Sequence, residues 1–397
     1  MYKKYTISEI GEIVSGATPK TTVSANFGGD IPWITPADLS GYSKKYISHG
    51  ARNLTMQGYN SCSTQLMPPG SVLLSSRAPI GYVAIAKNKI CTNQGFKSIV
   101  PKEIIDSEFL YYQLKYLRNV LQDLGSGTTF KELSAKKLSS VQVVVPPIEV
   151  QHAIVSKIEE LFSRLDASVA ELQTAKEKLK VYRRAVLKEM LEGDYPHVIL
   201  KEIATAFSGY AFKSKKYSSD GRYVVVKIGN VKSFHFDFSR DLTKTTEIDD
   251  GILNKYLLKK GDCLITMTGS RGKRDYGYVA MIEDQDNYLL NQRVSALRFN
   301  ASVALPKFYK YVLSSPQYRN QFFSYETGNV GQGNVGIKAL TEPTVICPPI
   351  KIQEKIVQNI EFRLSLYDSI EQTIDTSLQQ AESLRQSILK RAFEGKL

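Results

Sequence analysis

The chain contains one distinctive segment twice, and this repeat limits its architecture more than any other feature does. "VVVPPIEVQHAIVSKIEEL" at 143–161 returns as "VICPPIKIQEKIVQNIEFR" at 345–363. The two proline pairs set an offset of 202 residues, from 146 to 348, and the match then continues without a gap as far as Gly193 and Gly395. Loops accumulate insertions and deletions, so a gapless match of this length indicates a segment whose length is itself constrained.

Each copy predicts one long helix that begins after its proline pair, because proline is tolerated only in the first turn of a helix. Apolar or small residues then recur at alternating spacings of four and three, interrupted at Ser168, which is typical of a coiled-coil seam. In the first helix the predicted seam residues are Ile154, Ile158, Leu161, Leu165, Leu172 and Leu179. In the second helix they are Ile356, Ile360, Tyr367, Ile374, Leu384 and Ile388.

The segments before the two helices also correspond, although more loosely. "ISEIGEIVSG" at 7–16 resembles "LKEIATAFSG" at 200–209, and "IGYVAIA" at 80–86 resembles "YGYVAMI" at 276–282. Such short β-rich runs with turns between them predict mixed α+β globular domains. If the two seams pair, chain direction makes the pair an antiparallel coiled coil with a pseudo-two-fold internal repeat; the alternative is that each helix packs only on its own globular domain. The predicted domains are 1–147, 148–193, 194–349 and 350–397.

The distribution of charge separates the globular domains from the helices. The chain carries a net charge of +13. The helical segments hold equal numbers of basic and acidic residues, eight of each in 148–193 and seven of each in 350–397. The excess therefore lies in 1–147, with 16 Lys and Arg against nine Asp and Glu, and in 194–349, with 21 against 15. An evenly spread solubility charge would not divide in this way, and two basic domains predict two contacts with nucleic acid.

Candidate DNA contacts lie in polar stretches of the two basic domains. Lysine supplies a point charge for phosphate, whereas Arg, Asn and Gln also form paired hydrogen bonds with base edges. In 1–147 the candidates are Lys20, Thr21, Thr22, Lys44, Lys45, Arg77, Thr128, Thr129 and Lys131. In 194–349 they are Lys213, Lys215, Lys216, Arg271, Lys273, Arg274, Gln332 and Asn334. We predict base reading by Arg77, Arg271, Arg274, Gln332 and Asn334, against the alternative of solvated surface residues, and leave open a structural role for Arg293.

Enzyme and metal signatures do not emerge from the sequence. The glycine-rich "GNVGQG" and "GSRGKR" lack the spacing of nucleotide-binding loops. The four histidines, His49, His152, His197 and His235, are scattered, and Cys62, Cys91, Cys263 and Cys347 form no C-x-x-C pair, so free thiols and no metal are expected. No apolar run is long enough for a membrane span and no secretory leader is evident, which predicts a cytoplasmic chain that does not contact a membrane.

Several segments together resemble the specificity subunit of a type I restriction–modification enzyme. They are "SGATPKTT" and "GGDIPWITPADL" within 15–39, "SSRAPIGYVAIA" at 75–86, "TNQGF" at 92–96, the two proline-pair segments, and the endings "LKEMLEG" and "LKRAFEG". The second globular domain departs from the pattern, since "YVVVKIGNV" at 223–231 stands where the first has "IPWITPADL". This divergence is what two domains that read different bases would show.

The resemblance implies a non-catalytic subunit of a bacterial or archaeal complex. Its two target-recognition domains would read a bipartite site in double-stranded DNA, and the paired helices would set the spacing. Two methyltransferase subunits carrying S-adenosylmethionine, and then restriction subunits with motor activity, would join it, so the chain itself needs no cofactor. The apolar residues expected outside the seam, as docking points or as packing on the adjacent domain, are Phe162, Val169, Phe362 and Phe393. Rival readings are a stand-alone coiled-coil DNA-binding protein, a nuclease with an unrecognised site, and a scaffold for an acidic protein.

Overall fold

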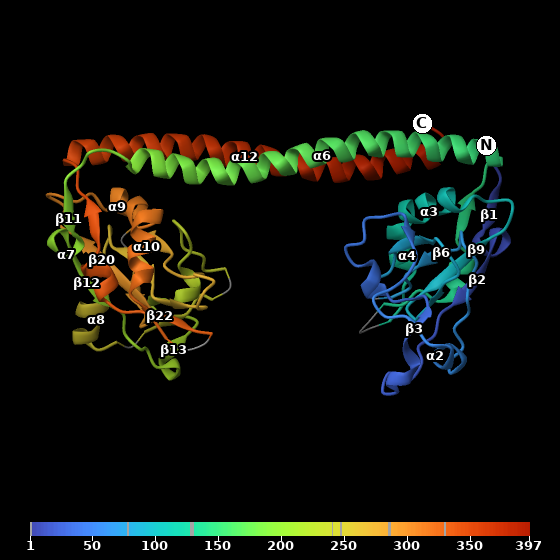
Figure 1. Ribbon diagram of the computed structural model, residues 1–397, viewed down its shortest axis with the longest axis horizontal. Helices are drawn as coiled ribbons and strands as arrows, with labels where there is room; N and C mark the ends of the chain where they lie inside the picture. Colours follow the sequence, from blue (N-terminus) through green and yellow to red (C-terminus); the bar gives the residue numbers. More distant parts are fainter. Residues whose placement is uncertain are drawn as a thin grey trace. The chain divides into compact units, whose positions relative to one another are not determined.

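The computed structural model describes residues 2–397 except 78, 128–130, 240, 247, 285–286 and 329–330. It divides into two compact units, which are described separately: unit 1 is Met1–Thr174 with Ile374–Leu397, and unit 2 is Ala175–Thr373. Two long helices, α6 (Ile148–Leu191) and α12 (Ile350–Phe393), each contribute one part to each unit (Figure 1). We call the globular part of unit 1 head 1 and that of unit 2 head 2.

Head 1 is built on a five-stranded sheet in the order β2-β9-β6-β7-β5, whose neighbours are antiparallel except for β5 and β7. Of the remaining strands, β1 pairs with β10 and β4 pairs with β8 in two-stranded sheets, and β3 makes isolated bridges with Leu54. The strands are β1 (Lys4–Thr6), β2 (Gly11–Ser15), β3 (Phe27–Ile31), β4 (Trp33–Ile34), β5 (Tyr46–Ile47), β6 (Val72–Leu74), β7 (Val83–Ala86), β8 (Cys91–Thr92), β9 (Lys97–Pro101) and β10 (Gln142–Val144). The helices are α1 (Ile7–Ile10), α2 (Met56–Asn60), α3 (Ser107–Tyr116), α4 (Arg118–Leu124) and α5 (Ala135–Ser139), with 3₁₀ turns η1 (Ser24–Asn26) and η2 (Pro36–Leu39).

Head 2 has a four-stranded antiparallel sheet in the order β12-β20-β16-β18 and smaller sheets β13-β15-β14-β19, β17-β22-β21 and β11-β23. Its strands are β11 (His197–Ile199), β12 (Ala204–Ser208), β13 (Tyr217–Ser218), β14 (Tyr223–Val226), β15 (Lys244–Thr245), β16 (Cys263–Thr266), β17 (Thr268–Gly269), β18 (Val279–Met281), β19 (Tyr288–Leu290), β20 (Val294–Phe299), β21 (Glu326–Thr327), β22 (Gly333–Val335) and β23 (Thr344–Ile346). Its helices are α7 (Leu200–Ile203), α8 (Asp250–Tyr256), α9 (Pro306–Val312), α10 (Pro316–Ser324) and α11 (Lys338–Thr341), with 3₁₀ turns η3 (Ser214–Lys216) and η4 (Ile228–Asn230).

The two heads repeat one topology, so the predicted α+β class and internal repeat are confirmed. The order β2-β9-β6-β7 in head 1 corresponds to β12-β20-β16-β18 in head 2. In each order, the third strand (β6 in head 1 and β16 in head 2) is buried on both faces, and its side chains alternate between two cores. In β16, Cys263 and Ile265 enter the core shared with the long helices, whereas Leu264 enters a second core on the opposite face.

The long helices pair antiparallel within each unit. In unit 1, Ile158 and Phe162 of α6 share a core with Ile388 and Ala392 of α12. Arg385 forms an ion pair with Asp166 in the same unit. In unit 2 the counterpart residues, displaced by 202, are Arg183 and Asp368, and they pair at 3.9 Å. The two heads therefore do not each bury their own helix alone.

The seam between the helices lies one residue away from the predicted register at several positions. From Leu165 to Val186 of α6, half-buried or buried residues recur at alternating spacings of four and three, and every other residue of this stretch is exposed. We take this row of residues, extended at its start by Phe162, as the seam. On α6 these seam residues are Phe162, Leu165, Val169, Leu172, Lys176, Leu179, Arg183 and Val186, and on α12 they are Ile360, Leu364, Tyr367, Glu371, Ile374, Leu378, Ala381, Arg385 and Ile388. Polar residues hold four of the positions, and this hid the register in the sequence.

Three expectations about the residues of the seam change as a result. Leu384 is 50% exposed and lies beside the seam, because Arg385 takes the position that faces α6. Leu161 packs on head 1 at the border of its core, while its neighbour Phe162 enters the core. Ser168 does not interrupt the seam, since Val169 occupies that position.

A buried glutamine fastens each long helix to its head. The Gln151 side chain is 0% exposed; its Nε2 donates to Ile104 O (2.9 Å) and Pro146 O (2.8 Å), and its Oε1 accepts from Asp106 N (2.8 Å). The counterpart Gln353 makes the same three bonds in unit 2 and is also 0% exposed. These bonds explain why the segment "PPI", two residues and Gln occurs twice.

Candidate nucleic-acid interface

In head 1, four chain segments distant in sequence meet at one surface. The backbone N–H of Ala17 donates to Thr92 O (3.0 Å), that of Ser76 to Gly95 O (2.7 Å), and that of Leu133 to Ser76 O (2.8 Å). The side chains of Thr18 and Gln94 also bond to each other. We define surface 1 as the described residues of 17–22, 76–77, 93–95 and 126–133.

In head 2, the corresponding segments meet through the same backbone bonds. Tyr210 N donates to Leu290 O (2.9 Å), Met267 N to Arg293 O (3.1 Å), and Val335 N to Met267 O (2.9 Å). We define surface 2 as the described residues of 210–216, 267–274, 291–293 and 326–335. The short sheet β17-β22-β21 brings two of its loops together, with Gly269 opposite Gly333. Surface 2 therefore joins the two glycine-rich stretches of the second domain.

The loop 270–275 of surface 2 is held by bonds at both of its ends. Ser270 N donates to the Asp275 carboxylate (2.6 Å), and this bond lowers the pKa of Asp275. The guanidinium of Arg271 donates to Gly328 O (2.6 Å), which ties the loop to β21 and its following turn. These two bonds restrain the loop, and a restrained loop loses less entropy on recognition.

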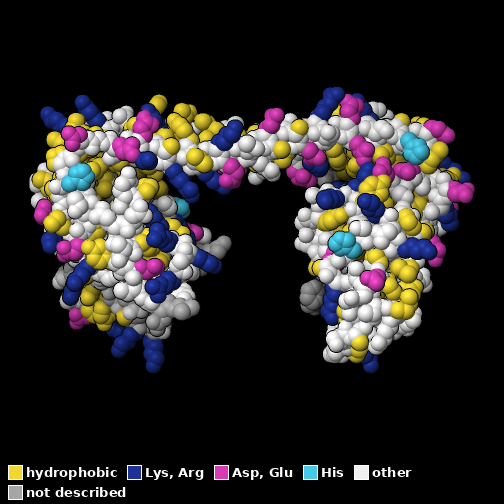
Figure 2. All heavy atoms as spheres, in the orientation of Figure 1, with side chains coloured by type: hydrophobic (Ala, Val, Ile, Leu, Met, Phe, Trp, Pro, Cys, Tyr) yellow, Lys and Arg dark blue, Asp and Glu magenta, His cyan; other side chains and the backbone are white. Residues whose placement is uncertain are grey.

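Most of the predicted contacts lie on these two surfaces. On surface 1 these are Lys20, Thr21, Thr22, Arg77 and Lys131, and on surface 2 they are Lys213, Lys215, Lys216, Arg271, Lys273, Arg274, Gln332 and Asn334. All are exposed except Arg77 and Asn334, which are half-buried. Figure 2 shows Lys and Arg side chains at the end of head 2 farthest from the long helices, around β13. Thr128 and Thr129 fall outside the described residues.

Arg77 and Asn334 have partners within their surfaces. The guanidinium of Arg77 lies 3.9 Å from the Glu132 carboxylate, which Lys97 also approaches at 3.8 Å. The backbone carbonyl of Asn334 accepts a bond from the Thr327 hydroxyl (3.2 Å) in the β21–β22 hairpin. Both side chains remain on the surface, but their backbone is fixed by the fold.

Lys44 and Lys45 lie apart from surface 1, and for Lys45 the structure gives a different role. Its ammonium pairs with Glu108 of α3 (2.6 Å) and with Glu159 of α6, and so joins head 1 to the long helix. Burial opposes the charged form and lowers the pKa of Lys45, but the hydrogen bonds that its ammonium donates to the two carboxylates outweigh burial, so the pKa is raised. A cation neutralised by two acids is a poor contact for phosphate, so Lys45 is a structural residue.

Replacing Lys45 tests this correction. Lys45→Met is expected to destabilise unit 1 by about 1.5 to 3 kcal/mol, because two acids lose their hydrogen-bonded partner, and to leave DNA affinity unchanged. Urea unfolding and duplex binding measure the two effects. The exposed neighbour gives the control, since Lys44→Met should not change stability. A loss of DNA affinity without a loss of stability in Lys45→Met would contradict the structural role.

Sequence reasoning missed two glutamines of these surfaces and left the role of Arg293 open. Gln94 of surface 1 and Gln292 of surface 2 are exposed at equivalent places, each following an asparagine, and Arg293 is also exposed. Arg293 is therefore not buried inside head 2 as a structural partner, although it follows the apolar strand β19. The repeated Asn-Gln in "TNQGF" and "LNQRV" was the available signal for the two glutamines.

Metal-ligand clusters, disulfides and membrane spans are the other features that can be compared with the sequence expectations. Among them no cluster of three or more His, Cys, Asp or Glu side chains could hold a metal ion. All four cysteines are free thiols, and burial raises the pKa of Cys91 to about 12. None of the described helices is both long enough and apolar enough to span a bilayer.

Comparison with known sequences decides the family. Residues 1–177 and 193–380 each match the family described as "Type I restriction modification DNA specificity domain". The chain belongs to this family. The chain is 49% identical over 150 residues to the type I restriction enzyme MjaIX specificity subunit of Methanocaldococcus jannaschii. This match covers 37% of this chain and 35% of that one. The chain is 26% identical over 317 residues to the EcoKI specificity subunit of Escherichia coli K12, covering 75% and 67%.

One solved structure shares the fold of this chain. It comes from work described as "Structural basis underlying complex assembly and conformational transition of the type I R-M system". The TM-score is 0.76 at 16% sequence identity, and the match covers 100% of this chain and 98% of the other. At this identity the likeness shows the fold alone.

Proposed function

We propose that the chain is the DNA-recognition subunit of a type I restriction–modification complex and that surfaces 1 and 2 each read one half of a bipartite target. One observation carries the proposal: the same four-segment surface is built twice on one scaffold, with different side chains on each copy. Surface 1 presents Arg77 and Gln94, while surface 2 presents Arg271, Gln292 and Gln332. Arginine and the amide side chains are the groups that read base edges in the major groove.

We propose further that α6 and α12 fix the separation of the two half-sites. Each helix is continuous for 44 residues, or about 66 Å at 1.5 Å per residue. Each is fastened to its own head by a buried glutamine, so head and helix move together. The neutral charge of both helices suits contact with protein better than with DNA.

Methyltransferase subunits are the proposed partners of the helices, with S-adenosylmethionine bound to them and not to this chain; restriction subunits would complete the complex. Of the four apolar residues expected outside the seam, Phe162 and Val169 face the seam and Phe393 packs on Phe109 at 5.3 Å between ring centroids. Phe362 is 73% exposed, and Leu366 and Ile370 follow it one and two turns later at 57% and 42%. We assign the docking role to this exposed stripe of α12.

The test of the proposed function begins with the target. The chain and its partner subunits are expressed together in a host, and the methylated sites are mapped. Two separated sequence elements with a constant gap are expected. Methylation at unrelated sequences, or cleavage by the isolated chain with Mg²⁺, would favour the stand-alone or nuclease alternatives.

With the target known, two substitutions on surface 2 separate base reading from phosphate contact. Gln332→Ala is expected to cost about 1 to 3 kcal/mol of binding to the target alone, because a base-edge contact is lost. Lys215→Ala should weaken binding to every duplex and lower the slope of affinity against salt by about one. Lys260→Ala, an exposed lysine outside surface 2, is the control and should change neither. Competition binding with single-base target variants makes the measurement; equal losses for Gln332→Ala on all duplexes would contradict base reading.

A further inference from the structure

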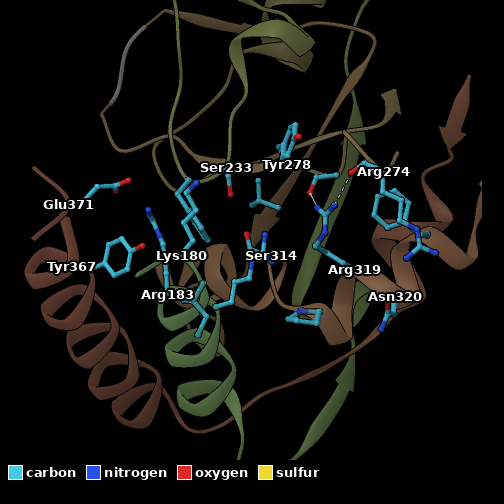
Figure 3. A pocket seen from close by; sticks show the side chains of 17 residues that line it. Lys180, Arg183, Ser233, Arg274, Tyr278, Ser314, Arg319, Asn320, Tyr367 and Glu371 are labelled. Atoms are coloured by element: carbon cyan, nitrogen blue, oxygen red, sulfur yellow. Dashed lines mark hydrogen bonds between the residues drawn. The ribbon is translucent and has the colours of Figure 1, made fainter. Parts of the chain in front are cut away.

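Unit 2 contains a cavity of about 680 Å³ between head 2 and the long helices, and of its lining residues only Arg274 belongs to surface 2. Five cations and one acid line it. Lys180, Arg183 and Arg184 come from α6, Arg274 from the loop 270–275, Arg319 from α10, and Glu371 from α12. Figure 3 shows Lys180 and Arg183 on one side and Arg319 on the other. The volume falls within the range of sites for small molecules.

Most of this charge has no carboxylate to balance it. In the described part of the chain, no carboxylate forms an ion pair with Arg184, Arg274 or Arg319. Arg183 pairs with Asp368 at 3.9 Å, and Lys180 pairs with Glu177 at 2.7 Å. Arg319 donates to the carbonyls of Gly277 (2.7 Å), Arg274 (3.2 Å) and Tyr276 (3.2 Å), which fix its guanidinium without neutralising it. Arg274 and Arg319 both lie 5.0 Å from the centre of the Phe323 ring. Like charges gathered around a hollow raise the energy of the empty site and favour an anion in it.

Backbone strain points to the same place. Among the described residues, only two that are not glycine have positive φ: Phe234 at 70° and Arg274 at 50°. Both line the cavity. The left-handed region is unfavourable for residues other than glycine and is concentrated at ligand sites. The strain and the charge are independent observations.

Unit 1 supplies an internal comparison. A smaller cavity of about 270 Å³ lies at the equivalent place, lined by Arg385 and Leu389 where unit 2 has Arg183 and Leu187. The 202-residue offset shows that the two other cations of α6 are not repeated: Glu382 stands for Lys180, and Gln386 for Arg184. Lys115 and Arg118 also line the cavity of unit 1, so both cavities carry basic side chains. Unit 2 differs by the two further cations that α6 supplies, Lys180 and Arg184.

We propose that the cavity of unit 2 binds phosphate groups through Arg184, Arg274 and Arg319 together with Lys180. Arginine and lysine at the rim of a preformed pocket match the charge and the acceptor oxygens of phosphate. Two sources carry this chemistry: a free polyphosphate that enters the cavity, and the backbone of bound DNA that lies across it. Of these four cations only Arg274 belongs to surface 2, so failure of the cavity site would leave the proposed function intact, and the target-mapping experiment tests that function separately.

The double variant Lys180→Glu/Arg184→Gln tests the site by giving unit 2 the residues that unit 1 already tolerates. The matched control is Lys178→Glu/Lys188→Gln, which changes the net charge equally at exposed positions of α6 outside the cavity. Calorimetric titration of the full chain uses inorganic tripolyphosphate as one probe and a target-free DNA duplex as the other. Thermal unfolding checks that both variants are folded.

If the cavity takes a free polyphosphate, the unaltered chain and the control variant each bind one tripolyphosphate. The double variant then binds tripolyphosphate at least tenfold more weakly, and its DNA affinity is unchanged. For DNA backbone, the double variant loses at least tenfold in duplex affinity and about two units of salt slope relative to the control, and tripolyphosphate competes with the duplex. Equal binding of both probes by the double variant and the control would overturn the proposal.

Discussion

Gln353→Leu is expected to lower the free energy of unfolding of unit 2 by about 3 kcal/mol. The substitution removes three hydrogen bonds and leaves Leu305 N–H and the carbonyls of Val303 and Pro348 without their partner in a site that is 0% exposed. Each buried polar group left unsatisfied costs about 1 to 3 kcal/mol, and the costs are not additive. The leucine is close in volume, so a cavity contributes little. Gln151→Leu should act in the same way on unit 1.

The measurement is denaturant unfolding, followed by hydrogen exchange at the start of α12. Gln358→Leu is the control, because Gln358 lies on the same helix and is exposed. If Gln353→Leu and Gln358→Leu unfolded at the same denaturant concentration, the buried amide would not be the fastening that the structure indicates. The repeated glutamine would then need another explanation.

Removal of seven residues from both long helices is expected to change the target itself. The segments are Glu171–Glu177 of α6 and Ile374–Gln380 of α12, and their loss keeps the alternating seam because Leu179 takes the place of Leu172 and Ala381 that of Ile374. Each helix shortens by about 10.5 Å, which corresponds to about three base pairs at 3.4 Å each. Methylation should move to sites with the same half-sites and a gap shorter by about three base pairs, or cease.

Deletion from one helix only is the control for this experiment. It puts the two seams out of register, and so it should abolish folding or assembly without defining a new target. Mapping the methylated sites in the host reads the result. An unchanged gap after the double deletion would show that the helices do not set the spacing.

The sequence predicted the elements that depend on local pattern better than those that depend on distant partners. The helices were expected at 148–193 and 350–397 and run over Ile148–Leu191 and Ile350–Phe393, because prolines and glycines act through their own backbone. The seam register failed where Arg183 and Arg385 occupy apolar positions. Their charge is met by an aspartate of the partner helix, which apolar periodicity does not reveal.

The recognition surfaces show the same limit. The polar, glycine-rich loops could be found from composition, but their convergence depends on bonds between distant segments such as Ser76 N to Gly95 O. Lys45 could not be distinguished from Lys44 in the sequence, since its two acids lie 63 and 114 residues away, at Glu108 and Glu159. The sequence left the role of Arg293 open, because it does not show that the burial of β19 stops before Arg293.

The division of the chain between its two units has a consequence for biosynthesis. Unit 2 is one uninterrupted stretch, Ala175–Thr373, and is complete before synthesis ends. Unit 1 begins first but lacks Ile374–Leu397, which brings Ile388, Leu389 and Ala392 to its core. On the ribosome, unit 1 therefore keeps apolar surface uncovered until Ile374–Leu397 has emerged, and a nascent chain in that state exposes the kind of surface that chaperones bind.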